Sequence, residues 1–174
     1  MHIHMILGIR KATTHDLFTI SALAMQTYTD AFGHSFSPVD LAAHLEKNLS
    51  PKNFERMLEE DTYLVAETDT HMLGFVQFGR GNLETDSSAT LELRRLYVLA
   101  DYQNKGIGTR LMNAALESPQ VKNAASIFLD VWEHNPGAQR FYARYGFVVT
   151  GKREFVVESG AETSCDLIMV RHQG

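Results

Sequence analysis

One stretch of the sequence decides the fold: residues 93–111 read LRRLYVLADYQNKGIGTRL. Its first third is rich in Leu, Tyr and Val and is typical of a β-strand, and its last part opens a helix with Ile107 and Leu111 at helical spacing. The turn between them contains Gly106 and Gly108. Small residues let the backbone approach a ligand, and the free N–H groups of a first helical turn suit a phosphate or pyrophosphate. The stretch therefore predicts an anion-binding turn between a strand and a helix.

This turn differs from two well-known phosphate loops. It lacks the Gly-Lys-Ser/Thr ending of a Walker loop, and Leu111 stands where a dinucleotide fingerprint needs a third glycine. Lys105 and Arg110 can add positive charge. Taken alone, a Gly-x-Gly at a helix start is equally compatible with a tight turn that binds nothing.

Regular alternation and capping residues predict the other elements. We expect Thr14 to cap a first helix, Ser37 followed by proline to open a second that Pro51 closes, and Asn135 followed by proline to open a helix that ends at Gly146. Strands are expected at residues 6–11, 62–67, 72–78, 90–99, 127–131, 147–150 and 166–171, with a short helical turn at residues 54–58 and a helix that follows residues 103–108 and stops at residues 118–119. The order βααβββαβαββ implies at least one parallel pair of strands, so the predicted class is mixed α/β.

Composition limits the possible functions. The chain has 174 residues, 44% of them hydrophobic, and no internal linker or repeat, so we expect a single domain over residues 1–174. With one cysteine, no long apolar run and no secretory signal, we expect a cytoplasmic protein that does not bind membranes. The net charge of −5 and the scattered Lys and Arg residues argue against nucleic acid as a partner. The eight histidines lack zinc-site spacing, so we expect no metal.

The wider pattern resembles a known superfamily. Gln103-x-x-Gly106-x-Gly108 follows a strand, and Asn135 and Phe141-Tyr142-x-x-Tyr145-Gly146-Phe147 follow about thirty residues later. This arrangement resembles the GCN5-related N-acetyltransferase (GNAT) superfamily over nearly the whole chain. The segments 131–135 and 166–169, together with Thr150-Gly151, are similar to the PaiA-type spermine/spermidine acetyltransferases.

The resemblance implies a fold and a cosubstrate. The implied fold is a twisted, mostly antiparallel mixed sheet of about seven strands flanked by helices, with a parallel pair splayed around acetyl-CoA. Leu96, Tyr97 and Val98 would pair their backbone with the pantetheine arm and supply oxyanion donors, and Asn135 would reach the pantetheine region. The pyrophosphate would be held by main-chain N–H groups of the loop that comprises Gln103, Asn104, Lys105, Gly106, Ile107, Gly108 and Thr109.

Acetyl transfer to an amine needs a proton donor for the departing thiolate and a proton acceptor for the ammonium. Tyr142 matches the family tyrosine beside the cofactor sulfur and is our candidate acid, although a tyrosine on this apolar stripe is also compatible with a purely structural role. Glu92 is our candidate base, because alternation places it beside Arg94 and opposite Leu91 and Leu93. A solvated carboxylate paired with an arginine is an equally good interpretation of Glu92.

The acceptor is predicted to be a primary amine of a polyamine such as spermidine or spermine, attacked directly in a ternary complex. Four carboxylates are available near the expected acceptor mouth: Glu84, Asp86, Glu92 and Glu133. The alternatives are a peptide, protein or other small-molecule amine as acceptor, or a non-catalytic acetyl-CoA or polyamine sensor. The family resemblance also suggests a homodimer. Cys165 is interpreted as a buried small hydrophobic residue and not as a nucleophile.

Overall fold

A computed structural model describes residues 7–81, 90–156 and 163–173 of the chain. The strands are β1 (Gly8–Lys11), β2 (Thr62–Glu67), β3 (Met72–Arg80), β4 (Thr90–Val98), β5 (Ser126–Trp132), β6 (Val148–Val156) and β7 (Thr163–His172). The α-helices are α1 (Leu17–Phe32), α2 (Pro38–Leu49), α3 (Pro51–Glu60), α4 (Ile107–Glu117), α5 (Pro119–Lys122) and α6 (Pro136–Ala143). Short 3₁₀ turns occupy Thr14–Asp16, Gly33–Ser35 and Ala100–Tyr102.

The strands form a seven-stranded sheet in the order β1-β2-β3-β4-β5-β7-β6. β4 and β5 run parallel, with Thr90 opposite Ser126 and Glu92 opposite Phe128. The pairs β1–β2, β2–β3, β5–β7 and β6–β7 are antiparallel. The prediction of a mixed α/β fold with one parallel pair is confirmed, and the parallel pair is the one that encloses α4 and α5 in the sequence.

The chain divides into two compact units, and β4 contributes to both. The first unit consists of Met1–Gly79 and Arg95–Ser118, and the second of Arg80–Arg94 and Pro119–Gly174. The prediction of a single domain stays a prediction. None of the helices in the described ranges is both long and apolar enough to cross a lipid bilayer.

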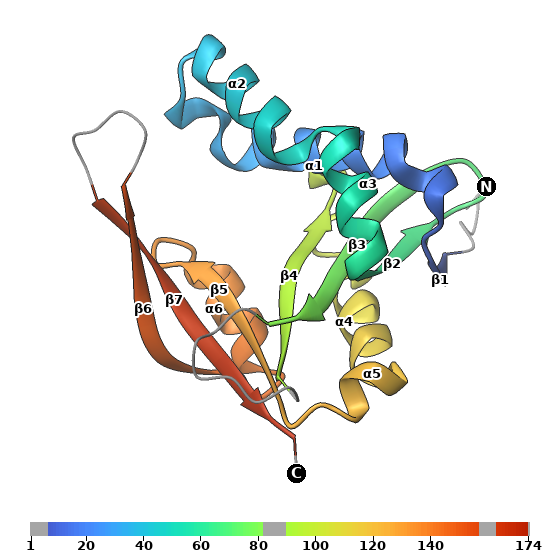
Figure 1. Cartoon of the computed structure of the whole chain (residues 1–174), viewed down its shortest axis with the longest axis vertical. Helices are drawn as coiled ribbons and strands as arrows, with labels where there is room; N and C mark the ends of the chain where they lie inside the picture. Colours follow the sequence, from blue (N-terminus) through green and yellow to red (C-terminus); the bar gives the residue numbers. More distant parts are fainter. Residues whose placement is uncertain (1–6, 82–89, 157–162, 174) are drawn as a thin grey trace. The chain divides into compact units, whose positions relative to one another are not determined.

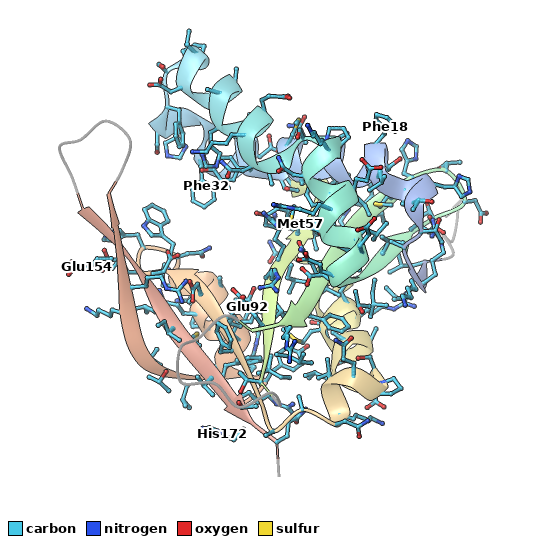
Figure 2. The ribbon with its side chains drawn as sticks, viewed as in Figure 1. Phe18, Phe32, Met57, Glu92, Glu154 and His172 are labelled. Carbon is cyan, nitrogen blue, oxygen red and sulfur yellow. The ribbon has the colours of Figure 1, made fainter. Side chains whose placement is uncertain are left out.

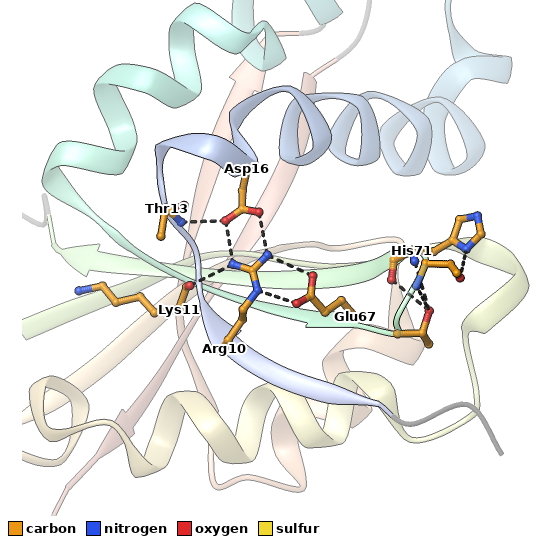
Figure 3. A network of polar contacts seen from close by, with 8 residues as sticks. Arg10, Lys11, Thr13, Asp16, Glu67 and His71 are labelled. Carbon is orange, nitrogen blue, oxygen red and sulfur yellow. Dashed lines mark hydrogen bonds and ion pairs between the residues drawn. The ribbon is translucent and has the colours of Figure 1, made fainter.

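Hydrophobic packing holds the first unit together. Figure 1 and Figure 3 show α1 on one side of β1 and β2 and α4 on the other. The core on the α1 side contains Ile20, Leu23 and Phe54 from the helices and Tyr63 and Phe75 from the strands. Burial of such side chains contributes about 1.5–3 kcal/mol each, which is ample to order this part of the sheet.

An ion-pair network fastens the start of α1 to the sheet (Figure 3). The Arg10 guanidinium donates to both carboxylate oxygens of Asp16, at 2.9 and 2.8 Å, and to Glu67, at 2.6 and 3.1 Å. Asp16 also accepts the Thr13 N–H at 2.8 Å. The hydrogen bonds from Arg10 lower the pKa of Asp16 against the opposing effect of its burial. The network therefore joins β1, β2 and the turn before α1.

A buried polar chain fixes the position of β4 within the first unit. The Gln77 amide is fully buried and donates to Asp61 Oδ2 at 2.7 Å, while its carbonyl oxygen accepts from Arg95 Nη1 at 2.8 Å. The Arg95 guanidinium also lies 5.6 Å from the centre of the Phe54 ring. Because buried polar groups need hydrogen-bond partners, this series of hydrogen bonds specifies where β4 lies against β3 and α3.

The predicted capping residues were right at two helices and wrong at one. Ser37 accepts the Asp40 N–H at the start of α2, and Asn135 accepts the Ala138 N–H at the start of α6. Thr14 does not cap α1: it lies inside a 3₁₀ turn, and the Asp16 carboxylate bonds the Thr13 N–H instead. Local spacing could not distinguish the two adjacent threonines.

Several predicted boundaries were too short. The turn expected at residues 54–58 is the ten-residue helix α3, and α5 follows Ser118 where the sequence suggested only a stop. β6 and β7 extend to nine and ten residues. The two strands pair beyond the apolar residues from which they were predicted, because backbone hydrogen bonds do not depend on the side chain. Their register shifts at a bulge between Val149 and Gly151.

Candidate functional site

The predicted phosphate turn has the backbone of an anion site. Asn104 and Gly106 adopt positive φ angles of 61° and 81°, and α4 begins directly after them at Ile107. No side chain of the described residues caps this helix. Successive N–H groups around left-handed residues form a concave nest, and the helix dipole adds partial positive charge. The turn can therefore receive a phosphate or pyrophosphate through its main chain.

Hydrogen bonds between residues close in sequence hold this turn against the end of β4. The Gln103 side chain donates to the Val98 carbonyl at 3.1 Å, and the Tyr102 N–H donates to Leu99 O at 2.9 Å. The Lys105 ammonium lies 5.5 Å from the centre of the Tyr102 ring and is exposed. Gln103 thus shapes the loop through its side chain, and Lys105 remains as an exposed positive charge.

Arg110 was expected to add charge to the turn. Its guanidinium donates to the carbonyl of Leu7, the residue before β1, at 3.1 Å. One nitrogen of Arg110 thus has a structural partner, and the contribution of its charge to anion binding stays a prediction.

The end of β4 approaches β3 very closely. A Cβ atom at Gly74 would lie 2.5 Å from the Tyr97 carbonyl oxygen, so only glycine fits there. The Tyr97 ring packs against Phe75, with ring centres 5.5 Å apart, so the contribution of Tyr97 to a ligand would come from its backbone. The described pairing of β4 with β5 extends only to Glu92. Residues 96–98 therefore lie beyond that parallel ladder, as the pantetheine prediction requires.

In the second unit, Asn135 has a clear structural role. Its side chain accepts the Ala138 N–H at 3.1 Å, and its own N–H donates to Trp132 O at 3.0 Å. Gln139 reinforces this corner by donating to the carbonyls of Trp132 and Glu133. Capping occupies the Asn135 side-chain oxygen, so its predicted contact with pantetheine stays a prediction.

Tyr142 lies on the apolar stripe of α6. It is half-buried, and its ring makes an edge contact with Phe147 at 5.9 Å between ring centres. Gly146, with φ of 87°, ends this turn and lets the Phe147 N–H reach the Tyr142 carbonyl at 3.3 Å. The packing is compatible with both interpretations of Tyr142, so its role as the acid stays a prediction.

Glu92 lies where alternation predicted. Leu91 and Leu93 are buried, whereas Glu92 forms an ion pair with Arg94 on the other face of β4 (Figure 2). Arg94 also donates to the Arg80 carbonyl at 2.6 Å. The ion-paired interpretation of Glu92 is thus observed, and its role as the base stays a prediction.

The other acceptor-side candidates fare differently. Glu84 and Asp86 lie outside the described residues. The Glu133 carboxylate accepts the Cys165 N–H at 3.2 Å. Cys165 is half-buried, and not buried as predicted, because its strand β7 leaves this position partly open. Desolvation and the nearby charge of Glu133 raise the pKa of its thiol, which disfavours the nucleophilic thiolate.

Sequence reasoning missed a second set of charged side chains in this unit. Arg153 Nη1 lies 3.2 Å from Asp130 Oδ2, and burial raises the pKa of Asp130 in spite of this cation. Burial and the charge of Asp130 raise the pKa of Asp166 as well. The signal in the sequence was an aspartate that interrupts the apolar run IFLDVW at residues 127–132. Among the described residues, no group of three or more His, Cys, Asp or Glu is placed to hold a metal ion.

Comparison with known proteins identifies the family. Residues 20–147 match the acetyltransferase (GNAT) family. The chain belongs to this family. It is 31% identical over 158 residues to an uncharacterized N-acetyltransferase of Mycobacterium tuberculosis, covering 90% of this chain and 97% of that protein. This GNAT chain is therefore an acetyl-transferring enzyme.

Two further relatives of this GNAT enzyme are informative. A Bacillus subtilis spermine/spermidine N(1)-acetyltransferase is 28% identical over 87 residues, which is 48% of this chain and 57% of that protein. The crystal structure of a PaiA N-acetyltransferase from Thermoplasma acidophilum in complex with coenzyme A is similar in fold, with a TM-score of 0.77 and 22% identity over 97% of this chain and 99% of that one. The predicted GNAT fold is confirmed.

Proposed function

We propose that this GNAT enzyme transfers the acetyl group of acetyl-CoA to a primary amine of a polyamine such as spermidine or spermine. The observation that carries the donor half is the uncapped, left-handed turn at the start of α4. The polyamine half is supported by the partial similarity to the Bacillus subtilis enzyme and by the net charge of −5, which favours cationic substrates. The proposed setting is the cytoplasm and the proposed assembly a homodimer.

The proposed donor site uses main-chain groups. The N–H groups of Asn104, Lys105, Gly106, Ile107, Gly108 and Thr109 hold the pyrophosphate, and the exposed Lys105 ammonium adds charge. The free edge of residues 96–98 binds the pantetheine arm, and Asn135 supplies a further contact with that arm. Main-chain recognition suits this role, because every backbone N–H in the turn can donate without a particular side chain.

The proposed chemistry is direct attack. Glu92 is the first candidate to accept a proton from the ammonium, and the freed nitrogen lone pair then attacks the thioester carbon. Backbone N–H groups of residues 96–98 stabilise the oxyanion. As the C–S bond breaks, the Tyr142 phenol donates its proton to the thiolate, and the second proton leaving the nitrogen restores the phenol.

A substrate panel tests the proposal. Release of the coenzyme A thiol is measured with polyamines, amino sugars, antibiotics and peptides as acceptors. Preference for spermidine or spermine is expected; turnover of a peptide alone would move the assignment to protein acetylation. Tight acetyl-CoA binding without acetylation of any amine would indicate a sensor.

A matched pair of variants tests the acid. Tyr142→Phe is expected to lower kcat by roughly 100-fold, the lower end of the usual contribution of general acid catalysis. Tyr145→Phe is the control, because Tyr145 lies on the same half-buried stripe and packs 5.3 Å from Phe141. Equal turnover by the two variants would remove Tyr142 from the mechanism.

A further inference from the structure

The charged set missed by sequence reasoning lies on one face of the second unit. On β5, Asp130 faces Ile168 of β7, and Trp132 faces Asp166. Asp166 in turn faces Arg153 of β6. Residues directly opposite in a sheet, and those two positions along, project from the same face. The register therefore brings Asp130, Asp166 and Arg153 together from three strands.

Only one of the two carboxylate oxygens of Asp130 has a partner among the described residues. Arg153 binds Oδ2 at 3.2 Å, and the side chain is 20% exposed. Its other oxygen, Oδ1, is buried and has no hydrogen-bond partner in the structure, which describes the ranges 7–81, 90–156 and 163–173. Buried carboxylate oxygens are rarely left without a donor, so an N–H donor that reached this oxygen by a small rotation of the partly exposed side chain would be favoured.

Burial and the charges on the neighbouring strands act on the affinity of Asp130 for a proton. The positive groups on this face are Arg153 on β6 and Arg94 on β4, and the negative groups are Asp166 on β7 and Glu92 on β4. Burial is the largest effect and raises the pKa of Asp130, whereas Arg153 lowers it. A carboxylate with a raised pKa is a stronger base than an ordinary surface aspartate.

Glu92 shares this face, because it lies opposite Phe128, two residues before Asp130 on β5. Its carboxylate is held by Arg94, so protonation of Glu92 would break that ion pair. Asp130 is ion-paired through Oδ2, and its Oδ1 has no hydrogen-bond partner among the described residues. A proton on Oδ1 would still leave Oδ2 as an acceptor for Arg153, so Asp130 can take a proton at an oxygen that no described donor occupies.

We infer that Asp130 is the catalytic carboxylate that takes the proton from the acceptor ammonium, with Arg153 as a positioning residue that holds its second oxygen. The inference rests on the proposed acetyl transfer to an amine and assigns its base to Asp130 in place of Glu92. One N–H proton passes to Asp130 Oδ1 and then to solvent. The nitrogen lone pair forms the C–N bond, the C–S bond breaks, the thiolate receives its proton from the Tyr142 phenol, and the second proton leaving the nitrogen restores the phenol.

The first experiment compares Asp130→Asn with Glu92→Gln on the best amine of the panel, from pH 6 to pH 10. Asp130→Asn is expected to lower kcat/KM by roughly 100-fold near neutral pH. The loss should shrink towards pH 10, because an alkyl ammonium deprotonates unaided near a pKa of about 10.4. Glu154→Gln is the control, since Glu154 is exposed on the outer side of β6 (Figure 2). A full loss in Glu92→Gln with none in Asp130→Asn would overturn the inference.

A second experiment does not need the Asp130 variant to fold. In the wild-type enzyme, carbon NMR of the Asp130 carboxyl should give a titration midpoint above the ordinary aspartate value of about 3.9. Arg153→Gln should move that midpoint, and the acidic limb of kcat/KM, to higher pH, because it removes the cation that lowers the pKa. A purely structural Asp130 would leave the limb of kcat/KM unmoved.

The outcomes separate the two proposals. Turnover of an amine by the wild-type enzyme, with unchanged pH profiles in Asp130→Asn or Arg153→Gln, overturns the role of Asp130 alone. A midpoint at or below about 3.9 does the same. Absence of turnover with every amine overturns the proposed function and, with it, the role of Asp130.

Discussion

Gly106 and Gly146 provide a matched test of the donor turn. Both adopt positive φ, 81° and 87°, and neither has crowded surroundings: a Cβ at Gly106 meets nothing within 4 Å, and one at Gly146 meets only Arg171 Nε at 3.9 Å. The cost of alanine at either position is therefore backbone strain without a clash. A left-handed L-residue costs about 1–2 kcal/mol, so each variant should be destabilised by that amount.

The predicted loss of stability is measurable. For a chain of this size, 1 kcal/mol shifts Tm by about 2–4 °C, so Gly106→Ala and Gly146→Ala should each lower Tm by about 2–8 °C. Their effects on acetyl-CoA should differ. Strain at Gly106 is relieved by movement of the turn, which takes N–H groups away from the phosphate. Losing one charge-assisted hydrogen bond costs about 1.5–3 kcal/mol, or roughly ten- to a hundredfold in Kd.

Calorimetric titration with acetyl-CoA and thermal denaturation of both variants measure these quantities. Gly106→Ala should weaken binding at least tenfold relative to Gly146→Ala at the same loss of Tm. If the two variants bind acetyl-CoA with equal affinity, the turn before α4 does not hold the pyrophosphate, and the geometric argument for the donor site is wrong.

Three further perturbations test the elements that support the site. Asp16→Asn should lower the free energy of unfolding by about 2 kcal/mol near neutral pH, because the charged hydrogen bonds from Arg10 weaken. Those bonds lower the pKa of Asp16 in the folded state. The difference in unfolding free energy between the variant and the wild type should therefore persist above pH ~4 and fade as the pH drops through the lowered pKa, as denaturation at several pH values would show. Gly74→Ala should cost about 1–3 kcal/mol and raise the KM for acetyl-CoA, since its Cβ would press on the Tyr97 carbonyl; unchanged Tm and KM would contradict this. Asn135→Ala should cost about 1 kcal/mol through loss of the helix cap, whereas Asn135→Ser should retain stability, so that any rise in KM common to both reports a contact with the cosubstrate.

Much of the structure of the proposed donor site was predictable because its signals are local. Gly106 and Gly108 mark the turn, the apolar residues before them form β4, and helical spacing after them forms α4. Each of these signals acts within about four residues, which is the range of backbone hydrogen bonds and of side-chain neighbours in a helix. The same locality explains why the caps at Ser37 and Asn135 were predicted correctly.

The proposed acceptor side depends on contacts that no local pattern contains. Alternation placed Glu92 beside Arg94 but could not decide between an ion pair and a base, and the structure shows the ion pair. Asp130 and Arg153 are distant in the sequence, and their contact follows from the shared pairing of β5 and β6 with β7.

The sequence by itself determined the fold class, the family and the strand–turn–helix of the proposed donor site, because periodicity, glycine conformation and helix capping are encoded in adjacent residues. Only the tertiary structure showed that half-buried Asp130 has one oxygen without a partner among the described residues, while Glu92 is ion-paired. Strand register and burial set which charges meet and how strongly each holds a proton, and both arise from packing of the whole sheet.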